Sequence, residues 1–330
     1  MPLPAKETLR KIIRLALGTE NDATLNGEVA WDALLELSTK EGVGGLVIKG
    51  LEKVFEKDAS LGKLNTLELK PIRNKWLTLA MKIEMQDKLQ NSRIAELSSL
   101  LQKDGFVSCV LKGQGVAQLY PEPLSRQCGD IDLWMQPAES KGISEDRWTI
   151  LDYLRSKWKT GKAVYHHVEV KAFKGTSLEV HYLPSWLYYP PANRKLQAFY
   201  REQAPLQFEN FREDVGFSIP TPLFNLVFSI THLYKHTFEE NVVLKQLVDY
   251  HYILLSSSRE DRLQAYDILC SIGLGKFTAY IMYRLKNELG TPSDVFLCPP
   301  SKVCRRPLGE ALCFFPWRVW HYLWRKKLNQ

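Results

Sequence analysis

Two aspartates, Asp130 and Asp132, are the residues of this sequence with the clearest potential for chemistry. Side chains two residues apart in a strand project from the same face, so a strand over Ile131–Met135 would hold both carboxylates together. Carboxylates this close repel each other unless a cation lies between them. Mg²⁺ is the natural candidate, because it prefers oxygen ligands and is usually bound by carboxylates together with phosphate oxygens.

Glu179 is the candidate third ligand. It lies in the run Ser177–Tyr182, where Leu178 and Val180 alternate with Glu179 and His181, as in a strand with one buried face. If this strand lies beside the strand of the aspartates, the three carboxylates converge and could hold two metal ions for the transfer of a phosphate group. Exposed acids on a solvated hairpin are the alternative, and we favour the metal site.

The elements that must position these carboxylates divide the chain into three parts. Residues 1–104 predict successive helices, because apolar side chains recur there at intervals of three and four. Within them, Ile72–Leu101 has no proline or glycine and predicts one long helix. Residues 105–184 predict an α/β core, and residues 185–330 predict a C-terminal helical domain.

Short β-rich runs and turn signals give the expected bounds of these elements. Strands are expected at residues 106–111, 131–135, 163–173 and 177–183, with a hairpin turn at 174–176. Helices are expected at 146–158 and, beyond an aromatic and proline-rich connection at 184–191, at 223–238, 242–256, 262–272 and 277–289. The sequence therefore predicts an α+β fold, in which a short mixed sheet with helices is flanked by N- and C-terminal helical regions.

The motifs of the core resemble those of a known family. They are Val110–Gly113, Leu119–Pro121, Arg126, Gly129–Leu133 and Leu178–Tyr182, which together are similar to the bacterial uncharacterised nucleotidyltransferase family. That family belongs to the DNA-polymerase-β-like superfamily. The resemblance is specific over residues 107–183 and continues more loosely to about residue 250.

The resemblance implies a polymerase-β-like core that transfers a nucleoside monophosphate from an NTP, such as ATP, to a hydroxyl acceptor. Pyrophosphate would leave, and the acceptor would be a small molecule or a protein. Asp130, Asp132 and Glu179 match the family's metal-binding and catalytic acids, with Mg²⁺ or Mn²⁺ as the cofactor and Glu179 nearest the acceptor. A non-catalytic nucleotide-binding regulator and an antitoxin-like interaction protein are the alternatives.

Residues around the acids are expected to contact the nucleotide. Better-known members of the superfamily carry Gly-Ser where this chain has Lys112-Gly113. Lys112 could reach phosphate as a point charge, and Gly113 would let backbone amides approach it. Arg126 is expected either to clamp phosphate through two parallel hydrogen bonds or to pair with one of the aspartates. We also place Gly129, which directly precedes Asp130, among these residues.

Further side chains are candidate substrate contacts. His167 and His181 lie on the predicted hairpin that carries Glu179, where they would orient a carboxylate, touch substrate or be ordinary strand histidines. His232 precedes another histidine by four residues, the spacing of zinc ligands, but packing or substrate contact is favoured because the glutamate of a zinc motif is missing. Lys245 and Asp249 share a helix face and would form an i,i+4 pair or contact the acceptor.

The overall composition is that of a folded protein able to bind an anion. The 330 residues are 45% hydrophobic and 25% charged, which is ordinary for a globular protein. The 44 Lys and Arg exceed the 37 Asp and Glu by seven, which suits a nucleotide, although a solubility surplus is the alternative. No basic stripe interleaved with aromatic residues marks a nucleic-acid track.

The expected cellular location follows from features that the sequence lacks. No apolar run approaches the roughly 20 residues needed to span a bilayer, and the N-terminus has no signal-peptide pattern. The six cysteines include no Cys-x-x-Cys pair. We therefore expect a cytoplasmic protein, and its oligomeric state stays open. The aromatic segment Phe314–Leu328 predicts a helix that packs on the helical domain, with membrane-surface binding as the alternative.

Overall fold

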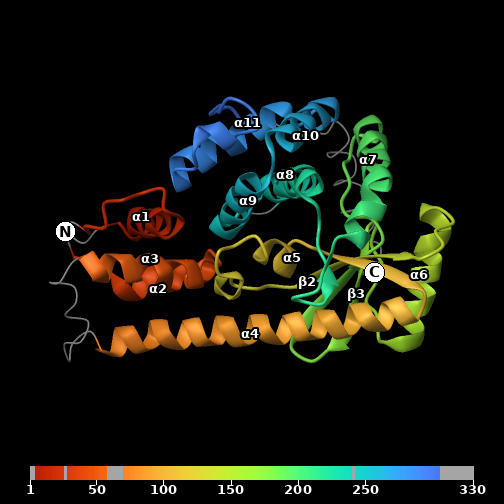
Figure 1. Ribbon diagram of the computed structural model, residues 1–330, viewed down its shortest axis with the longest axis horizontal. Coiled ribbons are helices and arrows are strands. Elements are labelled where there is room, and N and C mark those ends of the chain that lie inside the picture. The colour runs from red at the N-terminus through yellow and green to blue at the C-terminus, as the bar shows by residue number, and fades with distance from the viewer. Residues whose placement is uncertain (1–3, 26–27, 58–69, 240–241, 305–330) are drawn as a thin grey trace, which may run out of the picture.

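The computed structural model describes residues 4–25, 28–57, 70–239 and 242–304 (Figure 1). The aromatic segment Phe314–Leu328 therefore lies outside the described residues. Within the described part of the chain, no helix combines the length and the hydrophobicity that a bilayer span requires.

Helices lead up to the sheet, as predicted. They are α1 (Ala5–Leu17), α2 (Trp31–Lys40), α3 (Gly44–Lys57) and α4 (Lys70–Lys103). The 34-residue α4 is the predicted long helix, and it runs along most of the molecule beneath the other elements (Figure 1). Its buried face extends from Trp76 to Leu101, so one helix contacts both the N-terminal helices and the sheet.

The sheet has four strands and is mixed, as predicted. The strands are β1 (Phe106–Leu111), β2 (Ile131–Pro137), β3 (His167–Phe173) and β4 (Thr176–His181), in the spatial order β1-β2-β4-β3. β2 is antiparallel to β1 and parallel to β4, and β3 and β4 form the predicted hairpin. The helices α5 (Gly113–Ala117) and α6 (Ile143–Lys157) connect the first three strands.

The two faces of β2 lie in different surroundings. Ile131, Leu133 and Met135 are fully buried in a core formed with α4 and α6. On the opposite face, Trp134 is buried against the rings of Phe208 and Phe224. Asp132 shares that opposite face, so the alternation predicted for this strand is confirmed and the carboxylate points toward the C-terminal helices.

The C-terminal helices include one that the sequence analysis missed. They are α7 (Pro190–Glu209), α8 (Pro222–Glu239), α9 (Leu244–Ser256), α10 (Arg259–Ser271) and α11 (Gly275–Arg284), with a π-helical turn at Leu285–Leu289. A small hairpin, β5 (Phe211–Arg212) and β6 (Phe217–Ser218), follows α7, and 3₁₀ turns lie at Pro123–Ser125 and Ser293–Val295. The sequence predicts only a connection at residues 184–191, but Pro190 and Pro191 occupy the first turn of α7, where proline is well tolerated.

The N- and C-terminal helices share one hydrophobic core. Ile12 of α1, Val47 of α3, Phe224 of α8, Tyr250 of α9 and Phe277 of α11 all belong to it. The molecule is thus an α+β fold in which helices from both ends of the chain pack beside a short mixed sheet. The division at residues 104 and 184 stays a prediction.

Candidate active site

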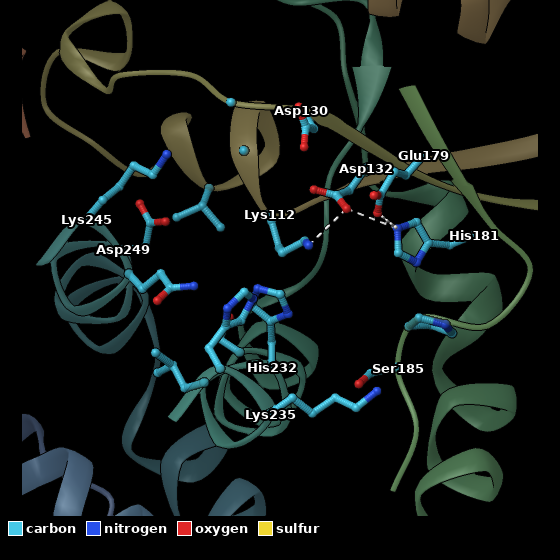
Figure 2. A pocket seen from close by; sticks show the side chains of 18 of the residues that line it. Lys112, Asp130, Asp132, Glu179, His181, Ser185, His232, Lys235, Lys245 and Asp249 are labelled. Carbon is cyan, nitrogen blue, oxygen red and sulfur yellow. Dashed lines mark hydrogen bonds and ion pairs between the residues drawn. The ribbon is translucent and has the colours of Figure 1, made fainter. Parts of the chain in front are cut away.

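A cavity of about 530 Å³ lies between the sheet and the C-terminal helices. All the site residues that the sequence nominated line it: Lys112, Gly113, Arg126, Gly129, Asp130, Asp132, His167, Glu179, His181, His232, Lys245 and Asp249. Figure 2 shows Lys112 and Asp132 near its centre, with Glu179 and His181 on one side and Lys245 and Asp249 on the other. Sequence reasoning did not nominate Ser185, Lys235 and Gln246, which also line it and belong to no motif.

The two strands that carry the acids lie side by side, which satisfies the condition set by the sequence analysis. β2 and β4 are parallel, and Asp132 is the register partner of Glu179. Ligand atoms of Asp132, Glu179 and His181 lie within 4.8 Å of one another, close enough to surround one cation. Asp130 precedes β2 and lines the same cavity, but it is not part of this close group.

Asp132 is the most tightly held of the three acids. Its Oδ1 is 2.9 Å from Lys112 Nζ and 3.0 Å from His181 Nε2, and its side chain is only 8% exposed. Burial alone would raise the pKa of Asp132, but the Lys112 ammonium and the His181 hydrogen bond outweigh burial and hold this pKa well below its ordinary range. Asp132 is therefore ionised at neutral pH.

The pKa values of the other two acids shift in opposite directions because their surroundings differ. The neighbouring His181 ring, 3.6 Å away and opposed by burial, lowers the pKa of Glu179. Burial and the negative charges of Asp132 and Glu179 raise the pKa of Asp130. A divalent cation would relieve this repulsion, and the oxygens of the three acids form a donor set suited to Mg²⁺ and also to Mn²⁺.

Lys112 adopts an unusual backbone conformation at the edge of the cavity. Its φ is 45° and its ψ is −151°, and it is the only non-glycine residue with positive φ in the described part of the chain. Such a conformation costs on the order of 1–3 kcal/mol and persists only where the surroundings impose it. Gly113 follows with φ +40°, so the chain turns sharply from β1 into α5 and brings the lysine to Asp132.

Arg126 pairs with neither Asp130 nor Asp132, which corrects one of its two expected roles. Its Nε and Nη2 donate to the two carboxylate oxygens of Asp249, each at 2.8 Å. Tyr120 Oη donates to the same carboxylate at 2.6 Å. The two parallel hydrogen bonds expected for phosphate are therefore made to Asp249, and only the buried Nη1 has no partner among the described residues.

Lys245 and Asp249 do not form the i,i+4 ion pair that was one of the two roles expected of them, and contact with the acceptor stays a prediction. Within the described residues, the only hydrogen bond of Lys245 Nζ is to the Gln127 carbonyl oxygen at 3.4 Å, because Arg126 holds Asp249. Burial and the neighbouring Arg126 guanidinium lower the pKa of Lys245. The lysine lies near Gly129, where an added Cβ would be 3.7 Å from its ammonium nitrogen.

His232 stacks in the wall formed by α8. Its ring lies 6.1 Å from the ring of Phe228 and 4.3 Å from that of His236, measured between centroids. Among the described residues this pair belongs to no group of three potential metal ligands. Packing next to the cavity, rather than a zinc site, agrees with the role favoured from the sequence.

A buried carboxyl on α4 supports the loop that carries the acids. Asp87 is 1% exposed and accepts a hydrogen bond from Gln114 Nε2 at 3.1 Å, while nearby Gln90 donates to the Gly129 carbonyl oxygen at 2.7 Å. Burial raises the pKa of Asp87 from its ordinary value of 3.8 to about 6. This buried polar layer links α4 to Gly129, next to Asp130.

The raised pKa of Asp87 predicts a pH-dependent stability. Between pH 3.8 and 6 the folded chain keeps a proton that the unfolded chain has lost, so the free energy of unfolding falls as the pH rises through this window. Above it, the buried charge costs about 3 kcal/mol, from 1.36 kcal/mol per pKa unit. Asp87→Asn should therefore raise the melting temperature at pH 8 and change it little at pH 4.

Thermal melts of both proteins across this pH range test the prediction. Glu84→Gln, on the exposed side of the same helix, is the control and should shift the melting temperature little at either pH. A melting temperature of Asp87→Asn below that of the wild type at pH 8 would contradict the conclusion that the ionised, buried Asp87 destabilises the fold.

Comparison with known proteins indicates the family of this chain. The profile of a family described as uncharacterised nucleotidyltransferase matches residues 27–290. A solved structure of an antigenic nucleotidyltransferase-like protein from Paracoccidioides brasiliensis is similar over 62% of this chain and 95% of its own, with 14% identity and a TM-score of 0.36. The search of curated proteins gave no match.

Proposed function

We propose, from the premise that this chain belongs to the uncharacterised nucleotidyltransferase family, that it transfers a nucleoside monophosphate from an NTP to a hydroxyl acceptor. One observation carries the proposal: Asp132 and Glu179 are register partners on parallel strands, and Asp130 lines the same cavity. The acids of this site are thus gathered at one place, beside a cavity large enough for a small ligand.

The acids fit a divalent cation and have separate parts in the proposed reaction. Mg²⁺ or Mn²⁺ bound to them would polarise the phosphate and lower the pKa of the acceptor hydroxyl. Glu179, whose pKa the neighbouring His181 lowers, is suited to accept the acceptor's proton. The acceptor oxygen then forms a bond to the α-phosphorus, the bond from that phosphorus to the bridging oxygen breaks, and pyrophosphate leaves with the electron pair.

Cationic side chains are suited to hold the triphosphate. Lys112, Lys235 and Lys245 reach the cavity from three different elements, and Arg126 adds a fourth positive charge at its wall. Lys112 forms an ion pair with Asp132 in this structure. A cation bound to the Asp132 carboxylate would free the Lys112 ammonium to bind phosphate. The hydrogen-bonding capacity that Arg126 has left is Nη1, so we expect one contact from it rather than a two-bond clamp.

Pyrophosphate release tests this function directly. The full chain is incubated with Mg²⁺ and each of the four NTPs, with metabolite and protein extracts as acceptors. We expect release with at least one NTP, and none above background from Asp130→Asn/Asp132→Asn. Glu169→Gln is the matched control, because Glu169 lies directly across from Glu179 on β3 but does not line the cavity.

The other outcomes identify the alternatives. Calorimetric NTP binding without any release would favour a regulatory nucleotide-binding protein. Neither binding nor release would contradict the proposed function.

A further inference from the structure

Three histidines gather on the cavity wall beside the acids. His166 lies in the loop before β3, His167 begins β3, and His181 ends β4. One ring nitrogen of each lies within 4.8 Å of those of the other two, and the three ring centroids are 4.3 to 5.5 Å apart. The proposed nucleotide transfer gives this cluster as a whole no role.

The backbone fixes the histidines in place. His167 and His181 are register partners in the β3–β4 hairpin. The amides of Tyr182 and Leu183 both donate to the His166 carbonyl oxygen, at 3.0 and 3.2 Å. The three rings are therefore brought together by main-chain hydrogen bonds, as in a site organised before its ligand arrives.

Two ring nitrogens of the cluster lack partners. His181 Nδ1 and His166 Nδ1 are buried and have no hydrogen-bond partner among the described residues, and His181 is only 3% exposed. Buried polar atoms are rarely left unpaired in proteins. An ion bound through the lone pair of His181 Nδ1 would account for that unpaired nitrogen.

His181 also has the surroundings of a metal ligand on its other nitrogen. Its Nε2 lies 3.0 Å from Asp132 Oδ1 and 3.6 Å from Glu179 Oε2. A histidine that binds a metal usually donates its second ring N–H to a carboxylate, which fixes the tautomer and leaves a lone pair on the other nitrogen. His181 is arranged in this way.

The spacing of the adjacent pair is close to that of two ligands of one ion. His166 Nε2 and His167 Nδ1 are 2.9 Å apart. Nitrogens about 2.0–2.1 Å from a common ion lie roughly 2.8–3.0 Å apart at octahedral angles and roughly 3.3–3.4 Å apart at tetrahedral angles. The 2.9 Å spacing of this pair matches octahedral angles, and the open cavity provides the path by which the ion enters.

We infer that His166, His167 and His181 form a site for a divalent transition metal of the zinc class, beside the carboxylates that would hold Mg²⁺. Imidazole nitrogens favour Zn²⁺, Co²⁺ or Ni²⁺, whereas Mg²⁺ favours oxygen. The site needs no nucleotide, so it goes beyond the proposed function. His181 links the two groups, with its Nε2 toward the acids.

Cobalt is the probe, because Co²⁺ bound to histidines absorbs visible light. The full chain, stripped of metal, is titrated with Co²⁺ and the visible spectrum is recorded. We expect one equivalent to bind, Zn²⁺ to displace it, and His166→Ala to weaken binding at least tenfold. His232→Gln and Asp130→Asn, which alter the same cavity outside the trio, should bind Co²⁺ as the wild type does.

A second variant separates ligand loss from misfolding. His166→Cys keeps a ligand, so it should restore Co²⁺ binding and add a sulfur-to-cobalt charge-transfer band in the near ultraviolet. Circular dichroism checks that each variant is folded. An absence of Co²⁺ absorption by the wild type would overturn the inference, as would binding that survives His166→Ala but is lost in Asp130→Asn. The assay contains no NTP, so its failure leaves the transferase test unaffected.

Discussion

Asp132→Asn is expected to abolish nucleotide transfer while the chain stays folded. Asparagine keeps the shape of Asp132 and an oxygen that accepts from Lys112 and His181, but it removes the charge that would hold the cation. A residue that only supports a metal ligand is worth about 10–100-fold in activity, so loss of a ligand should cost about 10³-fold or more. The measurement is the rate of pyrophosphate release at saturating Mg²⁺ and NTP.

The stability of this variant has to be followed alongside its activity. Because the pKa of Asp132 is depressed, its ionised form stabilises the fold above the unfolded-state pKa and loses this contribution as the pH falls. Asp132→Asn should therefore have a somewhat lower melting temperature than the wild type at pH 7 and still show an unchanged circular dichroism spectrum at 25 °C. Activity within tenfold of the wild type would mean that Asp132 is not a metal ligand.

Local pattern predicted much of the fold, because the information for those elements lies within a few residues. The alternation around Asp132 and Glu179 predicted which side chains of these strands enter the core, and the run without glycine or proline predicted α4. The pairing of two strands depends on residues far apart in the chain. The convergence of the three acids could therefore be predicted only on the condition that their strands lie side by side. α7 was missed although its two leading prolines are a recognisable helix start.

The site shows where local reasoning fails. A helical ion pair is one of the two roles that the spacing of Lys245 and Asp249 suggests, but Asp249 is held by Arg126, which is 123 residues away in the chain. An i,i+4 pair contributes only about 0.3–0.5 kcal/mol, whereas a buried bidentate arginine contact is far stronger. The positive φ of Lys112 could not be predicted either, because a strained backbone is imposed by the surrounding tertiary structure.

Asp249→Ala is expected to destabilise the fold more than a substitution of any exposed acid. Arg126 is 4% exposed and Asp249 14% exposed in their side chains, and removal of the carboxylate leaves the guanidinium buried and unpaired. Breaking a buried pair in this way costs about 3–5 kcal/mol. Tyr120 loses its hydrogen-bond acceptor as well. Urea unfolding at pH 7 measures the change, with exposed Glu84→Gln as the control.

A double-mutant cycle shows whether the pair itself is responsible. Arg126→Met alone should also destabilise the fold, because among the described residues it leaves the buried Asp249 carboxylate with only Tyr120 as a hydrogen-bond donor. Arg126→Met/Asp249→Leu removes both charges and replaces them with apolar groups, so it should be more stable than either single variant. If the single losses simply add in the double variant, the two residues are not coupled. In that case the contact between α9 and the loop before the acids has another basis.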